Sequence, residues 1–171
     1  MNLNFPATAN KEEVFAAVRQ YLTEHKFNII NEEYRPWGGF FVIDEEQAAQ
    51  FAHHFFEGDE RATVDDESNK LSPKILIVEA GSRLSWQYHD RRSEIWKVIG
   101  EACGIITSMT NKQGKLQVIP TDHIVTLRQG ERHRLIGLSA WGIIAEIWQH
   151  TDKEHPSDES DIVRLDDDFG R

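Results

Sequence analysis

A series of short apolar segments along the second half of the chain constrains the fold more than any other feature. The segments follow one another at intervals of roughly ten residues, and each is the length of a strand rather than of a typical helix. They read KILIVEAG, RLSWQYH, EIWKVIG, ACGIITSM, KLQVIP, HIVTLRQG, HRLIGL and WGIIAEIWQ. Glycines punctuate them at Gly81, Gly100, Gly114, Gly130 and Gly142. The pattern predicts an all-β sandwich or barrel and not a parallel sheet built from βαβ units.

The first third of the chain has a helical pattern instead. Residues 11–27 carry apolar side chains at helical spacing after Thr8 and Asn10, either of which can cap a helix. The pattern of residues 47–56 predicts a second, short amphipathic helix. Asp44 precedes it and resembles the first residue of a capping box. Both helices are expected to pack outside the β-structure.

Two further segments complete the predicted organisation. RPWGGFFVI is an extended stretch led by proline, and residues 57–70 form a polar, acidic loop without periodicity. We therefore expect residues 1–73 to form a helical and extended segment packed on a barrel. Residues 74–171 are expected to form that barrel and a polar C-terminal tail, and 171 residues favour one structural domain overall.

Composition and charge exclude several classes of protein. A formal net charge of −10 argues against general nucleic-acid binding, and no apolar run approaches the ~18 residues of a membrane-spanning helix. The single cysteine, Cys103, excludes an intrachain disulfide and a cysteine-rich zinc site. The first residues lack a basic segment followed by an apolar one, so the sequence predicts a cytoplasmic protein without a secretory signal.

The charge is unevenly distributed along the chain. Between Lys74 and His150 there are ten basic and seven acidic residues, whereas the rest of the chain carries the whole acidic excess. A basic middle fits a site for an anionic small molecule, although acidic ends that keep the protein soluble would produce the same imbalance.

Four polar residues on the predicted strands have the chemistry of a metal site. Gln87 and His89 are two residues apart, so they point to the same face of one strand. Glu94 opens the next strand, where an antiparallel return brings it beside His89, and His133 begins a later strand. Two imidazoles, a carboxylate and an amide oxygen suit zinc, which we expect first, or manganese, iron, cobalt or nickel. A mixed nitrogen and oxygen set without thiolates is typical of a catalytic metal.

Five motifs in order carry a resemblance to a known family. They are RPWGGF, LSWQYHDRRSEIWKVIGE, GERHRL, IIAEIWQ and DIVRLDDDFGR. Together they resemble the cupin superfamily and, within it, the type II mannose-6-phosphate isomerases, as a stand-alone cupin without the guanylyltransferase domain. The resemblance implies a double-stranded β-helix, or jelly-roll barrel, with N-terminal α-helices. It places the metal ligands at Gln87, His89, Glu94 and His133 and a catalytic arginine at Arg92. Ile136-Gly137 and the stretch TDKEHPSDES depart from the family pattern.

Other candidate site residues follow from the chemistry that the resemblance implies. A general base is needed, for which Glu94 and Glu146 are candidates; Glu146 lies in an apolar strand, where a carboxylate needs a partner. Alternatively, Glu146 could hydrogen-bond to a metal ligand, or it could face outward from an edge strand. Lys74 and Arg83 are the cations nearest in sequence to the site strands that we expect to bind a phosphate. Trp37, beside two glycines, is a candidate for stacking on a sugar ring.

The expected function is a metal-dependent aldose–ketose isomerase acting on a phosphorylated sugar. The first candidate reaction interconverts mannose 6-phosphate and fructose 6-phosphate through an enediolate. Alternatives are a cupin isomerase for another free or phosphorylated sugar, an oxygenase on the same metal, or a non-catalytic sugar-binding cupin. The expected partners are small molecules and a second copy of the chain in a homodimer, with neither nucleic acid nor a membrane.

Overall fold

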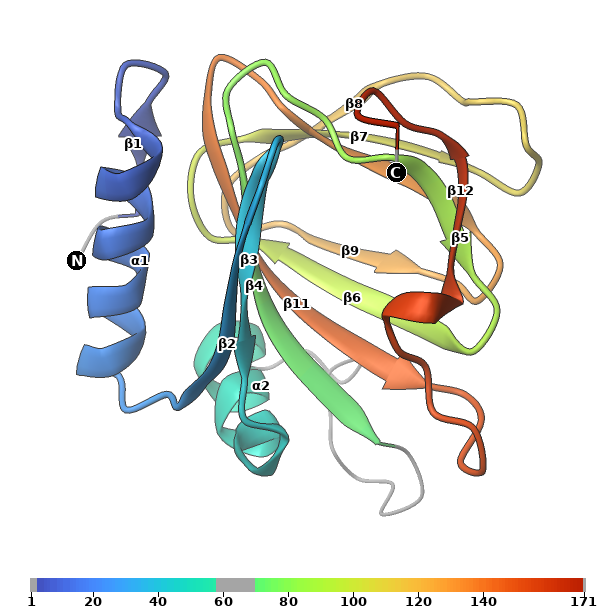
Figure 1. Cartoon of the computed structure of the whole chain (residues 1–171), viewed down its shortest axis with the longest axis horizontal. Helices are drawn as coiled ribbons and strands as arrows, with labels where there is room; N and C mark the ends of the chain where they lie inside the picture. The colour runs from blue at the N-terminus through green and yellow to red at the C-terminus, as the bar shows by residue number, and fades with distance from the viewer. Residues whose placement is uncertain (1–2, 58–69, 171) are drawn as a thin grey trace.

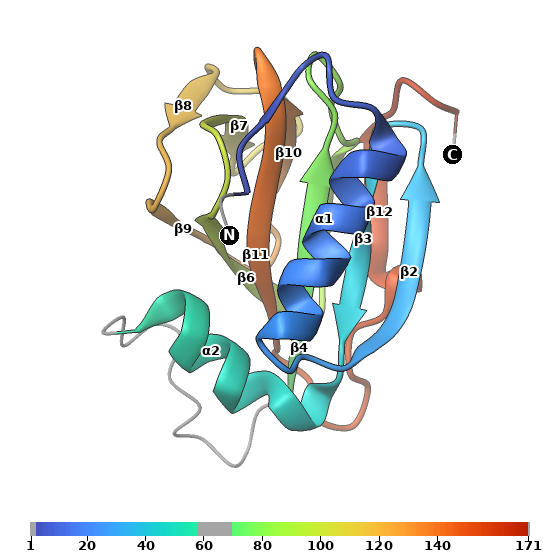
Figure 2. The same ribbon diagram turned by 90° about the vertical axis from the view of Figure 1, so that its left-hand side faces the viewer.

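The computed structural model describes residues 3–57 and 70–170. Two antiparallel β-sheets face each other, and two helices lie on the outer side of the larger sheet (Figures 1 and 2). The two-sheet antiparallel architecture confirms the all-β prediction, because every one of the eight expected strands is present. The acidic loop expected over residues 57–70 lies almost wholly outside the described residues.

The larger sheet contains seven strands in the order β2-β3-β4-β11-β6-β9, with β1 paired to β11. Their bounds are β1 Phe5–Pro6, β2 Ile29–Arg35, β3 Gly38–Ile43, β4 Leu71–Val78, β6 Arg92–Val98, β9 Ile124–Leu127 and β11 Ala140–His150. The N-terminal segment therefore supplies three strands of this sheet and does more than pack against a barrel.

The smaller sheet contains five strands in the order β12-β5-β10-β7-β8. Their bounds are β5 Trp86–His89, β7 Cys103–Ser108, β8 Gln117–Ile119, β10 Arg132–Gly137 and β12 Ile162–Asp166. The tail that the sequence presents as merely polar thus contributes an edge strand beside β5. A short 3-10 turn, η3 Glu159–Asp161, leads into that strand.

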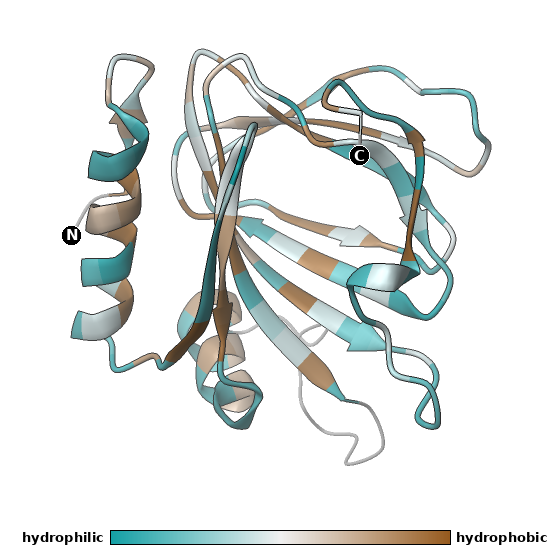
Figure 3. Cartoon of the chain, viewed as in Figure 1, coloured by the Kyte–Doolittle hydropathy of each residue, from teal (hydrophilic) through white to brown (hydrophobic). Residues whose placement is uncertain are grey.

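The helices begin close to where the sequence places them. Helix α1 spans Lys11–Glu24 and starts with a capping box between Asn10 and Glu13. Helix α2 spans Ala48–Phe56 and follows the 3-10 turn η1 Glu45–Gln47. The apolar side of α1 faces the sheet, as the hydropathy colouring makes visible (Figure 3). No helix among the described residues is long and apolar enough to cross a membrane.

The central strands β4 and β11 of the larger sheet are buried on both faces, which explains why they are largely apolar without alternation. On β4, Ile75 and Ile77 pack toward the helices, whereas Leu76 and Val78 face the space between the sheets. The outer cluster includes helix residues such as Phe15 and Phe51, and the inner cluster fills one end of the sandwich. The inner face also carries polar side chains toward the other end, and these build the site described below.

Two glycines let β3 enter the sheet between β2 and β4. A Cβ on Gly38 would lie 1.9 Å from the carbonyl oxygen of Ile77, and one on Gly39 would lie 2.1 Å from that of Glu33. Both glycines also adopt positive φ angles, which side chains disfavour. The glycine pair in RPWGGF is therefore required by the close packing of three backbones, next to the position of Trp37.

Candidate metal centre and cavity

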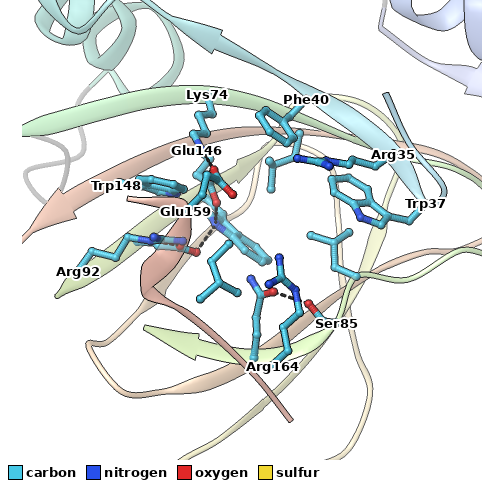
Figure 4. Close-up of a pocket in the computed structure, with 16 residues that line it drawn as sticks. Arg35, Trp37, Phe40, Lys74, Ser85, Arg92, Glu146, Trp148, Glu159 and Arg164 are labelled. Carbon is cyan, nitrogen blue, oxygen red and sulfur yellow. Dashed lines mark hydrogen bonds and ion pairs between the residues drawn. The ribbon is translucent and has the colours of Figure 1, made fainter. Parts of the chain in front are cut away.

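A cavity of about 270 Å³ opens between the two sheets and is lined by sixteen residues (Figure 4). They come from both sheets and from the C-terminal segment, and many are charged or aromatic. The charged ones are Arg35, Lys74, Arg92, Glu94, Glu146, Glu159 and Arg164, and the aromatic ones are Trp37, Phe40, Trp96 and Trp148. An enclosed space with both apolar walls and several converging polar groups is the usual form of a small-molecule site.

Three buried side chains from three strands converge beside this cavity. His89 on β5, Glu94 on β6 and His133 on β10 offer ligand atoms that all lie within 4.8 Å of one another. The Oε1 atom of Glu94 is 3.1 Å from Nε2 of His89, and its Oε2 atom is 3.5 Å from Nε2 of His133. The strands thus assemble the three residues whose spacing predicted a shared metal site.

Hydrogen bonds behind the two imidazoles direct their Nε2 atoms toward Glu94. Nδ1 of His89 lies 3.3 Å from the carbonyl oxygen of Asp161, and Nδ1 of His133 lies 2.9 Å from that of Glu131. A carbonyl oxygen only accepts, so each Nδ1 carries a hydrogen and each ring presents its Nε2 atom to the carboxylate of Glu94. This is the arrangement that orients histidine ligands in metal sites.

The buried Nε2 atom of His133 has no hydrogen-bond partner among the described residues. Burial also lowers the pKa of His133 to about 4, against the opposing charge of Glu94, so its imidazole is neutral near pH 7. A neutral imidazole with an unpaired lone pair beside a carboxylate and a second imidazole fits a divalent cation. We conclude that these residues suit a metal of the kind that nitrogen and oxygen donors hold.

Gln87, the fourth expected ligand, lies next to the other three. It is the register partner of His133 across β5 and β10, and it lines the cavity. Its Oε1 atom accepts a hydrogen bond from the Ser85 hydroxyl at 2.5 Å. The amide is therefore placed on the correct face, with a partner of its own to orient it.

Arg92 is held in place by several contacts at the cavity wall. Its Nε donates to Glu94 at 2.7 Å, one Nη to Ser157 Oγ at 2.9 Å, and the other Nη lies 3.1 Å from Nε2 of His89. The guanidinium also stacks on Trp148, 3.5 Å from the ring centroid. Burial alone would raise the pKa of Glu94, but His89 and Arg92 lower it well below its ordinary value.

Glu146 lies on the inner face of the sheet, which settles one of the alternatives left open by the sequence. On β11 it pairs in register with Lys74 on β4 and Trp96 on β6, and all three line the cavity. Trp96 Nε1 donates to Glu146 at 2.8 Å and also lies 3.2 Å from Glu94. Burial, reinforced by Glu94, raises the pKa of Glu146 to about 8.

Two of the three expected substrate-binding residues line the cavity, and the third does not. Lys74 and Trp37 line the cavity, and the buried indole nitrogen of Trp37 has no hydrogen-bond partner within the described part of the chain. Arg83 is not among the lining residues; its guanidinium is partly exposed and makes a bidentate ion pair with Asp168. Arg83 is therefore paired with Asp168 and is not one of the residues that line this cavity, so its role in substrate binding stays a prediction.

Several site residues were missed by the sequence reasoning. Arg35, Trp148, Glu159 and Arg164 line the cavity, and the carbonyl oxygen of Asp161 lies behind His89. Trp148 follows Glu146 by two residues in the same apolar strand, so the alternation of side chains along a strand places both on one face. This spacing could have identified Trp148 as a site residue. In the tail, the motif DIVRLDDDFGR contains Asp161 and Arg164, whereas Glu159 lies in an acidic stretch of a kind that is usually solvated.

Comparison with known proteins supports the fold. No family model matches the sequence, and no curated protein matches it. Among solved structures, a variant of the oxalate decarboxylase of Bacillus subtilis matches with a TM-score of 0.57 and 10% identity. That match covers 79% of this chain and 30% of the decarboxylase. The oxalate decarboxylase of Lactobacillus farciminis matches with a TM-score of 0.55 and 9% identity, over 79% and 33% of the two chains.

The chain has the cupin fold. It spans about a third of the length of the decarboxylases it matches. This confirms the predicted fold class, a mainly β cupin with N-terminal helices. Identities near 10% carry no information about substrate, so the chemistry of this chain follows only from its own cavity.

Proposed function

We propose that this cupin is a metal-dependent aldose–ketose isomerase acting on a phosphorylated sugar, with mannose 6-phosphate and fructose 6-phosphate as the first candidates. One observation carries the proposal. A buried His/His/Glu set and a separate buried carboxylate, Glu146, lie at one cavity that also contains fixed cations. Metal donors, an acid–base group and anion-binding groups are the three requirements of this reaction.

The reaction moves a proton between C1 and C2 of an open-chain sugar, and negative charge develops on two adjacent oxygens. A divalent ion held by His89, Glu94, His133 and Gln87 would supply the Lewis acidity that stabilises this charge. Arg92 supports the same role, because its guanidinium stays protonated and is fixed by Glu94 and Ser157. The sugar oxygens would thus meet positive charge that is already in position.

Proton transfer is assigned to Glu146. Its carboxyl group is buried at the cavity, is oriented by Trp96 and is separate from the three ligand side chains. Burial favours its neutral form, and a carboxyl group that exchanges its proton near neutral pH is suited to general acid–base catalysis. Trp37 offers an aromatic wall for the carbon face of the sugar.

The test is deuterium incorporation at C1 and C2 in D₂O, followed by NMR across a panel of aldose and ketose phosphates and the matching free sugars. The metal-loaded protein should exchange the proton of at least one sugar phosphate, and chelation should abolish the exchange. Glu146→Gln should lose roughly a hundredfold or more in rate while retaining metal. Glu154→Gln, which removes an exposed carboxylate elsewhere on the tail, is the matched control.

Other outcomes distinguish the alternatives. Exchange of free sugars alone would assign a different isomerase substrate. Sugar binding without exchange would make the protein a non-catalytic sugar-binding cupin. Bound iron with oxygen uptake and no exchange would replace the isomerase by an oxygenase.

A further inference from the structure

An ion pair with unequal burial lies at the cavity, between Lys74 and Glu159. The ammonium group of Lys74 is 2.7 Å from Oε1 of Glu159. The Lys74 side chain is only 7% exposed, whereas that of Glu159 is 53% exposed. Glu159 comes from the three-residue turn η3, outside both sheets, and reaches a cation that β4 holds in the wall (Figure 4).

Two aromatic rings lie beside the ammonium group of Lys74. Its Nζ lies 3.4 Å from the ring centroid of Trp148 and 4.9 Å from that of Phe40. Arg35, from the end of β2, lies over the same Phe40 ring at 5.7 Å and also lines the cavity. Lys74 is thus a desolvated cation beside two aromatic rings, and a second cation, Arg35, lies over one of these rings.

The carboxylate of Glu159 sits in a positive environment. Burial opposes its ionisation, but Lys74, and then Arg92 and Arg35, hold the pKa of Glu159 below its ordinary value. The Glu159 side chain is half exposed and belongs to a three-residue turn, so no strand pairing fixes its carboxylate against Lys74. Lys74 itself needs an anion, because a buried cation without one is costly.

We propose that Lys74 is the centre of the subsite for the phosphoryl group of the substrate, with Arg35 in the same cavity lining, and that the Glu159 carboxylate occupies this subsite until the phosphoryl group displaces it. The inference deepens the proposed function and rests on it for the sugar that carries the phosphate. A phosphate brings up to two charges and three acceptor oxygens where the carboxylate brings one charge and two oxygens. The displaced Glu159 can turn to solvent, since its side chain is already half exposed.

The experiment measures inorganic phosphate binding by isothermal titration calorimetry on chelator-treated protein, so that no metal contributes to anion binding. Glu159→Gln should bind phosphate about tenfold more tightly than wild type, because the competing charge is gone. Glu154→Gln removes the same charge from an exposed position on the same segment and should bind like wild type. Lys74→Met should lose phosphate binding in a protein whose circular dichroism is unchanged.

Each outcome decides the proposal. Equal affinity in wild type and Glu159→Gln overturns it, as does an equal gain in Glu154→Gln or the absence of phosphate binding in all variants. Weaker binding in Glu159→Gln would make Glu159 a structural partner of Lys74 and also overturns it. The failures remain distinguishable from those of the proposed function. If Glu159→Gln binds phosphate more tightly but the protein exchanges no sugar proton, the anion subsite is retained and the isomerase is rejected. If the protein exchanges sugar protons but Glu159→Gln binds phosphate as wild type does, the isomerase is retained and the role of Glu159 is rejected.

Discussion

Replacing Asp161 should destabilise the whole C-terminal segment that covers the site. Its buried carboxylate accepts hydrogen bonds from the backbone amides of Asp90 and Arg91, at 3.1 and 3.0 Å. It also accepts one from the Ser157 hydroxyl at 2.5 Å, and Ser157 in turn contacts Arg92. Among the contacts between the tail and the turn that joins β5 to β6, this carboxylate accepts both backbone hydrogen bonds of the turn, and its residue is only 6% exposed.

The size of the effect follows from these bonds. In the Asp161→Asn variant, the new side chain would retain one acceptor oxygen, while its amide group would face a backbone N–H that has lost its partner. A hydrogen bond to a charged group contributes about 1.5–3 kcal/mol, and an unsatisfied buried donor costs about 1–3 kcal/mol. We therefore expect a loss of roughly 2–4 kcal/mol, which for a chain of this size lowers the midpoint of thermal unfolding by about 5–15 °C.

Thermal and urea unfolding followed by circular dichroism would measure this loss. Glu154→Gln removes one negative charge from the same tail and should unfold within about 1 °C of wild type, as surface substitutions usually do. If Asp161→Asn unfolded together with Glu154→Gln, the carboxylate would not connect the tail to the turn. The reasoning from its hydrogen bonds would then be wrong.

The remaining predictions concern the cavity and the core. His133→Ala should weaken Co²⁺ binding more than the loss of a residue that only hydrogen-bonds to a ligand does, which costs roughly 10–100-fold. The control His123→Ala changes an exposed histidine and should leave Co²⁺ affinity unchanged. Equal affinities in the two variants would exclude His133 as a ligand. Arg92→Lys should keep metal and lose roughly 100–1,000-fold in turnover, because an ammonium cannot reproduce its separate contacts; wild-type turnover would refute this. The folded pKa of Glu146, about 8, is raised, so the stability it contributes is complete at acid pH and lost as the pH rises through about 8. Glu146→Gln should therefore gain stability relative to metal-free wild type as the pH rises from 4.5, the ordinary pKa, to about 8 in thermal unfolding, and a constant difference over this range would contradict it. Cys103, 1% exposed with its pKa raised by burial to about 12, should resist iodoacetamide until urea is added, and rapid native labelling would disprove its burial.

The strands were predictable because local pattern decides them. Apolar runs bounded by glycine read as strands wherever they lie, and β4 to β11 all appear where the sequence places them. The spacing of Gln87, His89 and Glu94 was also sufficient to align them, because alternation along a strand and an antiparallel return are local geometry. The long-range partner His133 was found from its resemblance and position, and the register of β10 on β5 places it opposite Gln87.

The edges of the sandwich were less predictable. Residues 29–35 carry a mixture of charged and apolar side chains, and only pairing with β3 makes them strand β2. The tail behaves in the same way, since β12 exists through its ladder with β5. An edge strand needs little apolar character, because one of its sides is exposed, and this removes the pattern on which prediction depends.

What the sequence determined by itself is the order of the central strands along the chain and the chemical identity of the candidate metal donors. What only the tertiary structure decided is which charges face one another. Glu146 meets Trp96, and Arg83 meets Asp168 instead of the cavity. Lys74 meets a carboxylate 85 residues further along the chain. The physical reason is that the alternation of side chains along a strand shows which residues share a face of the sheet. The distance between two charges depends instead on how the sheets and the tail pack, and the energy of a charge depends on that distance and on its burial.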